Sequence, residues 1–232
     1  MSRFGNIIAS VGFLAVSMTA ASAQNLIVDG DFEKPALNQA TFYQPGATFG
    51  GPSGTAWTVT GGGSNVGVAL SSTPTGSGTV YNGNSGNQWL DLTGNNDNGS
   101  AVGIRQSVAT VVGQAYSLTF FVGHKFDDCY PAIIGVSIDG GAFRNFSNGS
   151  MVAPGNNGVD NFAKFGFDFT ATKTLTTVEF RNGTFAGNRS PVAGLDDVTM
   201  LATPGRIAGA GLPVLAGMAG FAFLRRRRAA KA

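Results

Sequence analysis

The sequence between residues 24 and 202 is a series of short apolar stretches that alternate with polar residues and end at turn-forming residues. Because successive side chains of a strand point to opposite faces, this pattern predicts half-buried β-strands. Outside the two chain ends, no window shows the period of an amphipathic helix. About ten such strands fit an all-β jelly-roll sandwich of two sheets. The strands are expected near residues 25–33, 55–60, 66–70, 87–92, 101–109, 114–123, 133–139, 142–146, 162–170, 174–182 and 193–201.

Three of the predicted connections are informative. Residues 34–54 and 71–86 are rich in Gly, Pro, Ser, Thr and Asn, and connections of that length carry function or are mobile. Asp139-Gly140-Gly141, between two predicted strands, has the composition of a tight hairpin turn. The domain is therefore expected to have two extended surface loops and one compact hairpin.

Residues 1–23 have the features of a signal peptide with an N-terminal signal helix. Arg3 provides the positive charge, residues 7–16 are apolar, and Ala21-Ser22-Ala23 places small residues where signal peptidase cleaves. An uncleaved anchor is the alternative, but its apolar core would be short. Cleavage would leave Gln24 as the N-terminus of an exported domain, residues 24–202.

Residues 203–232 are predicted to anchor the chain in a membrane. Residues 207–224 contain no charged side chain and are long enough for a transmembrane helix. Four arginines, 225–228, follow directly, and basic residues beside a span stay on the cytoplasmic side. The domain would therefore be held outside the cytoplasm.

The tail combines a Pro-containing turn, Thr203-Pro204-Gly205, with a short apolar span and a terminal Arg cluster. This combination resembles the PEP-CTERM family of sorting signals in Gram-negative bacteria. In that family a membrane-embedded transpeptidase, the exosortase, is thought to cut near the Pro motif. Here the motif is not Pro-Glu-Pro, and Pro213 lies inside the span. The resemblance implies membrane anchoring, or release to the cell surface or extracellular matrix if the tail is processed.

Charge is distributed unevenly along the chain. Seven of the 15 Lys and Arg lie at the ends, whereas all 13 Asp and Glu lie between Asp29 and Asp197. The domain therefore has a net charge of −5, from 8 basic and 13 acidic residues. A nucleic-acid-binding protein would need a basic face, so we expect no nucleic acid as partner.

Six motifs follow one another along the domain. They are Asn25-Leu26-Ile27-Val28-Asp29-Gly30-Asp31-Phe32-Glu33, Trp57-Thr58-Val59, Gln88-Trp89-Leu90-Asp91-Leu92, Gly103-Ile104-Arg105-Gln106-Ser107-Val108, Gly113-Gln114-Ala115-Tyr116-Ser117-Leu118-Thr119-Phe120 and Gly194-Leu195-Asp196-Asp197-Val198-Thr199-Met200. Their order resembles the galactose-binding-like superfamily, in particular carbohydrate-binding modules and related cell-wall proteins. The resemblance spans residues 25–201 and implies a jelly-roll sandwich that binds extracellular polysaccharide.

In that superfamily the first and last strands pair, and a structural calcium often lies where they meet. The resemblance implies a Ca²⁺ site with Asp31 or Glu33 from the opening motif and Asp196 or Asp197 from the closing one, since Ca²⁺ prefers oxygen ligands. Because successive strand residues point to opposite faces, only one of Asp196 and Asp197 is expected to reach one site. The alternative is that these carboxylates are solvated or fix turns.

A sugar-binding site needs aromatic rings that cover the apolar face of a sugar and polar groups that bind its hydroxyls. The candidate rings are Tyr43 and Tyr81 in the long loops, and Trp57 and Trp89 in predicted strands. A sandwich more often uses tryptophans at such strand positions in its core, so the two tyrosines are the stronger candidates for ligand contact.

No catalytic motif stands out. The only His and the only Cys, His124 and Cys129, lie in a segment expected to be a polar loop, without the spacing of a metal or nucleophile motif. The sequence therefore predicts a non-catalytic, exported protein that binds extracellular polysaccharide. One alternative is a structural matrix protein that contacts other protein copies and no sugar. A hydrolase that uses loop Asp residues is the least favoured alternative.

Overall fold

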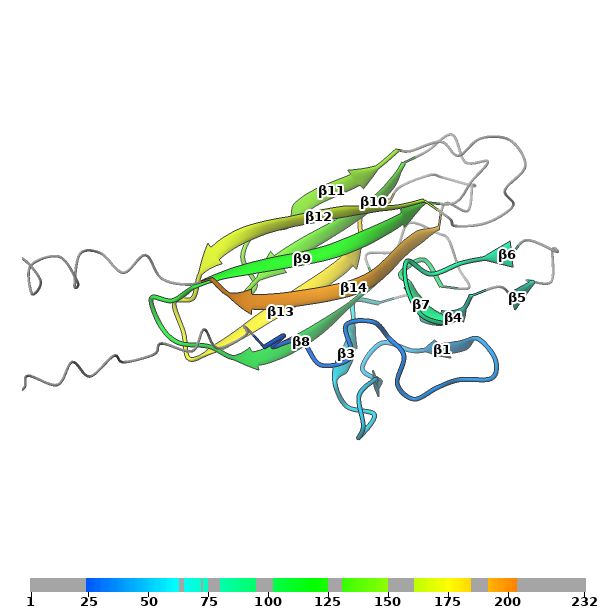
Figure 1. Ribbon diagram of the computed structural model, residues 1–232, viewed down its shortest axis with the longest axis horizontal. Coiled ribbons are helices and arrows are strands. Elements are labelled where there is room, and N and C mark those ends of the chain that lie inside the picture. The colour runs from blue at the N-terminus through cyan, green and yellow to red at the C-terminus, as the bar shows by residue number, and fades with distance from the viewer. Residues whose placement is uncertain are drawn as a thin grey trace, which may run out of the picture.

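The computed structural model describes residues 24–62, 65–71, 73–74, 80–94, 102–124, 131–149, 161–184 and 192–203. They form two six-stranded antiparallel sheets that pack face to face, and one short hairpin (Figure 1). The order in sheet A is β1 (Thr41–Tyr43), β4 (Val66–Leu70), β7 (Gln88–Asp91), β14 (Ala193–Ala202), β9 (Ala115–His124) and β12 (Asn161–Thr170). The order in sheet B is β11 (Arg144–Asn148), β10 (Ala132–Ile138), β13 (Leu175–Asn182), β8 (Gly103–Ala109), β3 (Trp57–Thr60) and β2 (Thr48–Phe49). The hairpin pairs β5 (Thr73–Pro74) with β6 (Val80–Tyr81). The predicted all-β sandwich is confirmed.

The core lies between the two sheets and follows the alternation in the sequence. In β9, Tyr116, Leu118, Phe120 and Val122 are buried, while the residues between them are at least partly exposed. Phe120 meets Phe180 of β13 edge to face, with ring centroids 5.2 Å apart. Each such side chain contributes about 1.5–3 kcal/mol by leaving water, so this layer provides most of the stabilisation of the fold.

Ten of the eleven predicted strands are present, with ends that shift by two residues or fewer. The predicted hairpin turn is also present between β10 and β11. Asp139 and Gly140 have φ of 54° and 74°, and Gly141 donates its N–H to the Ile138 carbonyl at 3.0 Å. Two consecutive positive φ values are typical of the turns that best match strand twist.

Three parts of the sequence-based description need correction. Residues 25–33 form no regular strand, because φ is 54° at Asp29 and 55° at Phe32, and these turns interrupt a ladder. The expected loop 34–54 contains the short strands β1 and β2, and the expected loop 71–86 contains β5 and β6. Strands of two or three residues are too short to produce a clear alternation in the sequence.

The predicted signal peptide, residues 1–23, and the predicted tail from residue 204 onwards, including the span 207–224, lie outside the described residues. Within the part of the chain that the structure describes, no helix is long and apolar enough to cross a membrane. Export and anchoring therefore stay predictions.

Candidate ligand-binding cleft

The opening segment, residues 25–33, lies against the last strand. Leu26 donates its N–H to the Met200 carbonyl at 2.9 Å, and Val198 donates its N–H to the Gly30 carbonyl at 2.9 Å. A Cβ atom at Gly30 would lie 2.0 Å from the Val198 carbonyl oxygen. Only glycine therefore allows the segment to approach β14 this closely.

Side-chain amides complete the backbone hydrogen bonding of the opening segment. The Gln106 amide accepts from the Val28 N–H at 2.8 Å and donates to the Val28 carbonyl at 3.0 Å, as a neighbouring strand would. Asn25 Oδ1 accepts from the N–H groups of Ile27 at 3.1 Å and Met200 at 2.9 Å. The buried backbone is thus satisfied although no regular ladder is present.

Asp29 connects the opening segment to the loop after β2. Its Oδ1 accepts from the Lys34 N–H at 3.0 Å, and its Oδ2 accepts from the Gly51 N–H at 2.9 Å. The Asp29 carbonyl also accepts from Trp57 Nε1 at 2.9 Å. Because Trp57 is fully buried in sheet B, these bonds attach an irregular segment to the rigid core.

These contacts surround a cleft of about 480 Å³ between the opening segment, residues 51–52 and β14. We call it the Asp29 cleft. Burial raises the pKa of Asp29, and the nearby Asp31 charge adds to this effect, while the N–H groups of Gly51 and Lys34 oppose it. The polar residues that line the cleft are Asn25, Asp29, Asp31, Lys34, Asp197 and Thr199.

The two closing carboxylates bind the same loop. Asp196 Oδ2 accepts from the N–H groups of Asn84 at 2.8 Å and Ser85 at 3.2 Å. Asp197 accepts from Asn84 Nδ2 at 2.6 Å and Ser85 Oγ at 2.8 Å. The β9–β14 register shifts between Asp196 and Thr199, and Asp197 has a φ of 48°, so both carboxylates reach this loop, whereas of the two only Asp197 lines the Asp29 cleft. A bulge of this kind re-aims side chains.

The predicted calcium ligands do not form one ligand set in this arrangement. Glu33 Oε1 accepts from the N–H groups of Asn87 at 2.6 Å and Gln88 at 2.7 Å. Asp196 is fully buried and accepts hydrogen bonds from loop N–H groups, whereas Asp31 and Asp197 line the Asp29 cleft. Among the described residues, no three of His, Cys, Asp and Glu are grouped as a metal site. Calcium at Asp31, Glu33, Asp196 and Asp197 therefore stays a prediction.

Two of the four aromatic side chains predicted to contact a sugar are buried. Trp57 and Trp89 are only 0% and 1% exposed, so neither presents a ring to a ligand, which corrects that expectation. Trp57 packs between Phe32 and Phe180, and Trp89 packs against Phe162. These rings are therefore part of the packed interior.

The surroundings of one of the two candidate tyrosines, Tyr43, are described by the structure. Tyr43 is half-buried and stacks on Phe49, with centroids 4.6 Å apart. Burial raises its pKa, and the Asp29 charge adds to this effect. Tyr81 belongs to β6, and its side chain lies outside the described part of the structure. Ligand contact by either ring stays a prediction.

His124 is not in a loop. It is the last residue of β9 and only 2% exposed, while Cys129 lies outside the described residues. Of the two Glu, Glu33 holds the loop before β7, and Glu179 accepts from Thr60 Oγ1 at 2.9 Å on sheet B. Neither Glu lines the Asp29 cleft.

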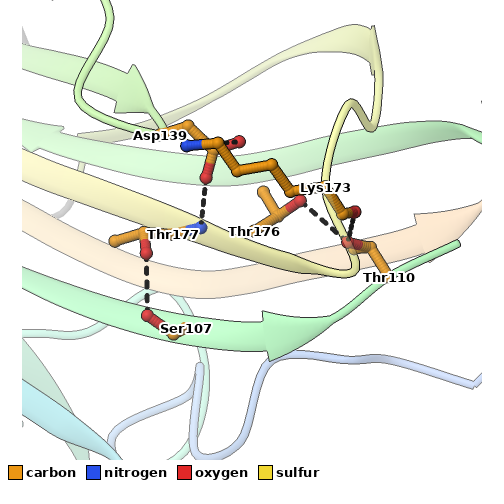
Figure 2. A network of polar contacts seen from close by, with 6 residues as sticks. All are labelled: Ser107, Thr110, Asp139, Lys173, Thr176 and Thr177. Carbon is orange, nitrogen blue, oxygen red and sulfur yellow. Dashed lines mark hydrogen bonds and ion pairs between the residues drawn. The ribbon is translucent and has the colours of Figure 1, made fainter. Parts of the chain in front are cut away.

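Two further hollows lie side by side on the outer face of sheet B, with volumes of about 540 and 440 Å³. They share Arg105 and Thr177 and are lined largely by hydroxyl and charged groups. Figure 2 shows part of their lining: the Thr177 N–H donates to Asp139 Oδ1 at 2.9 Å beside the first hollow, and the hydroxyls of Ser107 and Thr177 are 2.8 Å apart beside the second. Their borders combine strand residues of β8 and β13 with turn residues such as Asp139 and Lys173.

Sequence reasoning missed Asp29 and Lys34 as cleft residues, although it included Asp31 and Asp197. Asp29 lies within a motif that resembled a strand, and its partner Gly51 lies in a stretch that resembled a loop. A signal was available in Gly50-Gly51, because adjacent glycines often mark positive φ, and both have it here at 77° and 68°. The pairing with Asp29 depends on the fold.

The model of the family described as "Protein of unknown function (DUF642)" matches residues 25–200. The chain is a member of the DUF642 family. No curated protein sequence matches this DUF642 chain significantly.

Solved structures that resemble the DUF642 chain include several carbohydrate-binding modules. A family 35 module from Clostridium thermocellum is 11% identical, with 71% of this chain and 99% of the module covered and a TM-score of 0.40. TmCBM61, solved with β-1,4-galactotriose, is 15% identical, with 78% and 99% covered and a TM-score of 0.43. The CBM22-1–CBM22-2 tandem domain from Paenibacillus barcinonensis is 13% identical, with 84% and 50% covered and a TM-score of 0.43.

Proposed function

We propose that this DUF642 chain is a non-catalytic, exported protein whose sandwich domain binds a neutral extracellular polysaccharide in the Asp29 cleft. The observation that carries the proposal is the cleft itself, which has a volume of about 480 Å³ and a lining of carboxylate, ammonium, amide and hydroxyl groups. Small-ligand sites are concave and have volumes of roughly 300–1,000 Å³. The hydrogen bonds of Asp29 hold this lining in place before a ligand arrives.

The charges of the cleft select the class of sugar. Asp31 is exposed at the rim and can accept hydrogen bonds from sugar hydroxyls, while the Lys34 ammonium can donate to them. Three carboxylates and one ammonium line the cleft, which is an excess of two negative charges when all are ionised. This excess repels uronic-acid or sulfated chains and leaves a neutral polysaccharide as the preferred ligand.

Export is the part of the proposal that rests on sequence alone. Signal peptidase would release the N-terminus, and the PEP-CTERM-like tail would hold the galactose-binding-like domain outside the cytoplasm or hand it to an exosortase. A tether raises the effective concentration of many domains at one surface, so weak individual contacts can hold a polysaccharide matrix.

The test is binding of the chain to a panel of neutral and acidic polysaccharides by calorimetry, in calcium and then in EDTA. We expect saturable binding to a neutral polysaccharide and a loss of about tenfold or more in affinity for Asp31→Asn and Lys34→Ala, because each removes a charged hydrogen-bonding group. Lys173→Ala is the matched control, since Lys173 is exposed and lies away from the cleft. Loss of binding in EDTA would support the predicted calcium.

A folded chain that binds no polysaccharide in either buffer would refute the proposal. Equal losses in Lys34→Ala and Lys173→Ala would remove the cleft as the site. The alternative, a matrix protein that contacts other protein copies, is favoured by a different feature of the molecule, the long edge strand β12.

A further inference from the structure

Strand β12 is unusual among the four strands that end the sheets. The other three, β1, β2 and β11, are only three, two and five residues long, whereas β12 has ten residues. Figure 1 shows β12 beyond β9 as the last strand of sheet A. Among the described residues, no strand pairs with its outer edge.

The β12 edge is regular along its whole length. It pairs with β9 at ten successive positions without a register shift, from Asn161 opposite His124 to Thr170 opposite Ala115. No proline interrupts it. Proteins usually protect a sheet edge with short strands, bulges, prolines or charged side chains, and β12 has only the last of these.

Its charged side chains are arranged symmetrically. Lys164, Gly166 and Asp168 are exposed on the outer face of sheet A, so the opposite charges lie two residues on either side of the glycine. Phe165 and Phe167, which point towards the core, are half-buried. The Lys164 ammonium lies 5.9 Å from the Phe121 ring centre, which is a long cation–π distance, so the side chain can turn towards the edge.

We propose that two copies of the chain associate through β12, antiparallel and about a two-fold axis at Gly166. In this register Lys164 of each copy lies opposite Asp168 of the second copy, and Phe165 lies opposite Phe167 of the second copy. The two six-stranded A sheets become one continuous sheet, and the β12 edge of each copy is covered by the other.

Charge complementarity selects this register. A two-fold axis perpendicular to the sheet keeps inner residues opposite inner ones, so alternative registers differ by two residues. Each such shift places Lys164 or Asp168 opposite Gly166 or an uncharged residue. A lysine on an edge normally opposes self-pairing because like charges meet, but here the second copy presents a carboxylate to it.

Site-directed crosslinking of the full chain in a Cys129→Ser background tests this register. Lys164→Cys and Asp168→Cys chains, differently tagged and mixed, should crosslink to each other on oxidation, since side chains on opposite strand positions have Cβ atoms about 4.5–5.5 Å apart. Each variant alone is the control, because residue 164 of one copy and residue 164 of the second lie about 13 Å apart in this register. A crosslink that forms only in the mixture supports the proposal.

No crosslink in the mixture, or equal crosslinking of either variant alone, overturns it. Sedimentation of charge variants gives an independent measurement. Lys164→Asp and Asp168→Lys should each weaken the dimer by at least tenfold, and the double variant should restore it, while circular dichroism checks the fold. Failure of the double variant to restore the dimer would also overturn the register. None of these outcomes depends on sugar binding at the Asp29 cleft.

Discussion

The opening segment and the β12 region are ordered in different ways. The opening segment has no ladder and is fixed by side chains that bind backbone groups, above all Gln106 on Val28 and Asp29 on Gly51. Strand β12 has an unbroken ladder, and its inner rings pack on β11, where Phe146 stacks on Phe167 with centroids 5.8 Å apart.

This difference suggests a division of roles. An irregular segment directs carboxylates and backbone groups into a cleft. A regular strand inside a sheet cannot do this, because its backbone N–H and C=O groups are hydrogen-bonded to the neighbouring strands. A regular edge offers one long row of backbone groups to a second strand. The first arrangement suits a small polar ligand, and the second suits another copy of the chain.

The largest expected effects come from removing the buried ring that packs beside each region, Trp57 of β3 beside Phe32 and Phe120 of β9 beside Phe165 of β12. Trp57→Ala and Phe120→Ala should each lower the free energy of unfolding by about 3–5 kcal/mol, since both side chains are fully buried. Only Trp57→Ala should also abolish polysaccharide binding, because Trp57 Nε1 holds the Asp29 carbonyl. Urea unfolding followed by circular dichroism, with binding measured on the folded fraction, provides the comparison. Equal binding losses in the two variants would show that the cleft depends on overall stability alone.

The next effect concerns Asp196 and the loop that it holds. Burial raises its pKa to about 7 from 3.8, and the Asp197 charge adds to this effect. The native state therefore keeps a proton that the unfolded state releases near pH 4, and stability should fall as pH rises from about 4 to 7, by up to about 1.4 kcal/mol per pH unit. Urea unfolding in EDTA across this range measures the slope.

Asp196→Asn should flatten that slope, because the amide does not titrate. The same slope in the native protein and in Asp196→Asn would assign the pH dependence to other groups.

The regular strand β12 could be predicted from the sequence, whereas the irregular opening segment could not. The alternation in residues 162–170 and 114–123 predicted β12 and β9 to within one residue. A strand that is buried on one face has alternating apolar and polar residues, so it can be recognised from its own sequence. Residues 25–33 also look like a strand, yet Asp29 and Phe32 adopt positive φ. Their conformation depends on Gly51, Trp57 and Gln106, which are distant in sequence.

The candidate site was predicted only in part for a related reason. Asp31 and Asp197, two of the four predicted calcium ligands, both line the cleft, while the calcium site itself stays a prediction. The bulge at Asp196 and the burial of Trp89 arise from register and loop packing, which alternation does not specify. Lys34 carried no local signal for a role in the cleft.

A smaller effect separates two aspartates with the same backbone conformation. Asp29 and Asp139 both have a φ of 54°, and each accepts backbone hydrogen bonds, two for Asp29 and one for Asp139. Asp29→Ala should therefore cost about 2 kcal/mol and Asp139→Ala about 1 kcal/mol in the free energy of unfolding, measured in urea. The Asn variants tolerate positive φ and should cost less. A larger loss at Asp139 would contradict the view that Asp29 fixes the opening segment.

The smallest effect is expected at Lys173. Its ammonium lies 4.0 Å from Asp139 Oδ2, and its side chain is 62% exposed, so water screens the pair. Lys173→Ala should change the free energy of unfolding by less than about 0.5 kcal/mol in urea, with no change in polysaccharide binding. The neighbouring Thr110 hydroxyl, which donates to the Lys173 carbonyl at 2.8 Å, is unaffected by this change and keeps the turn in place (Figure 2). A loss above 1 kcal/mol would mean that this corner depends on the ion pair, and Lys173 could then no longer serve as the neutral counterpart of Lys34.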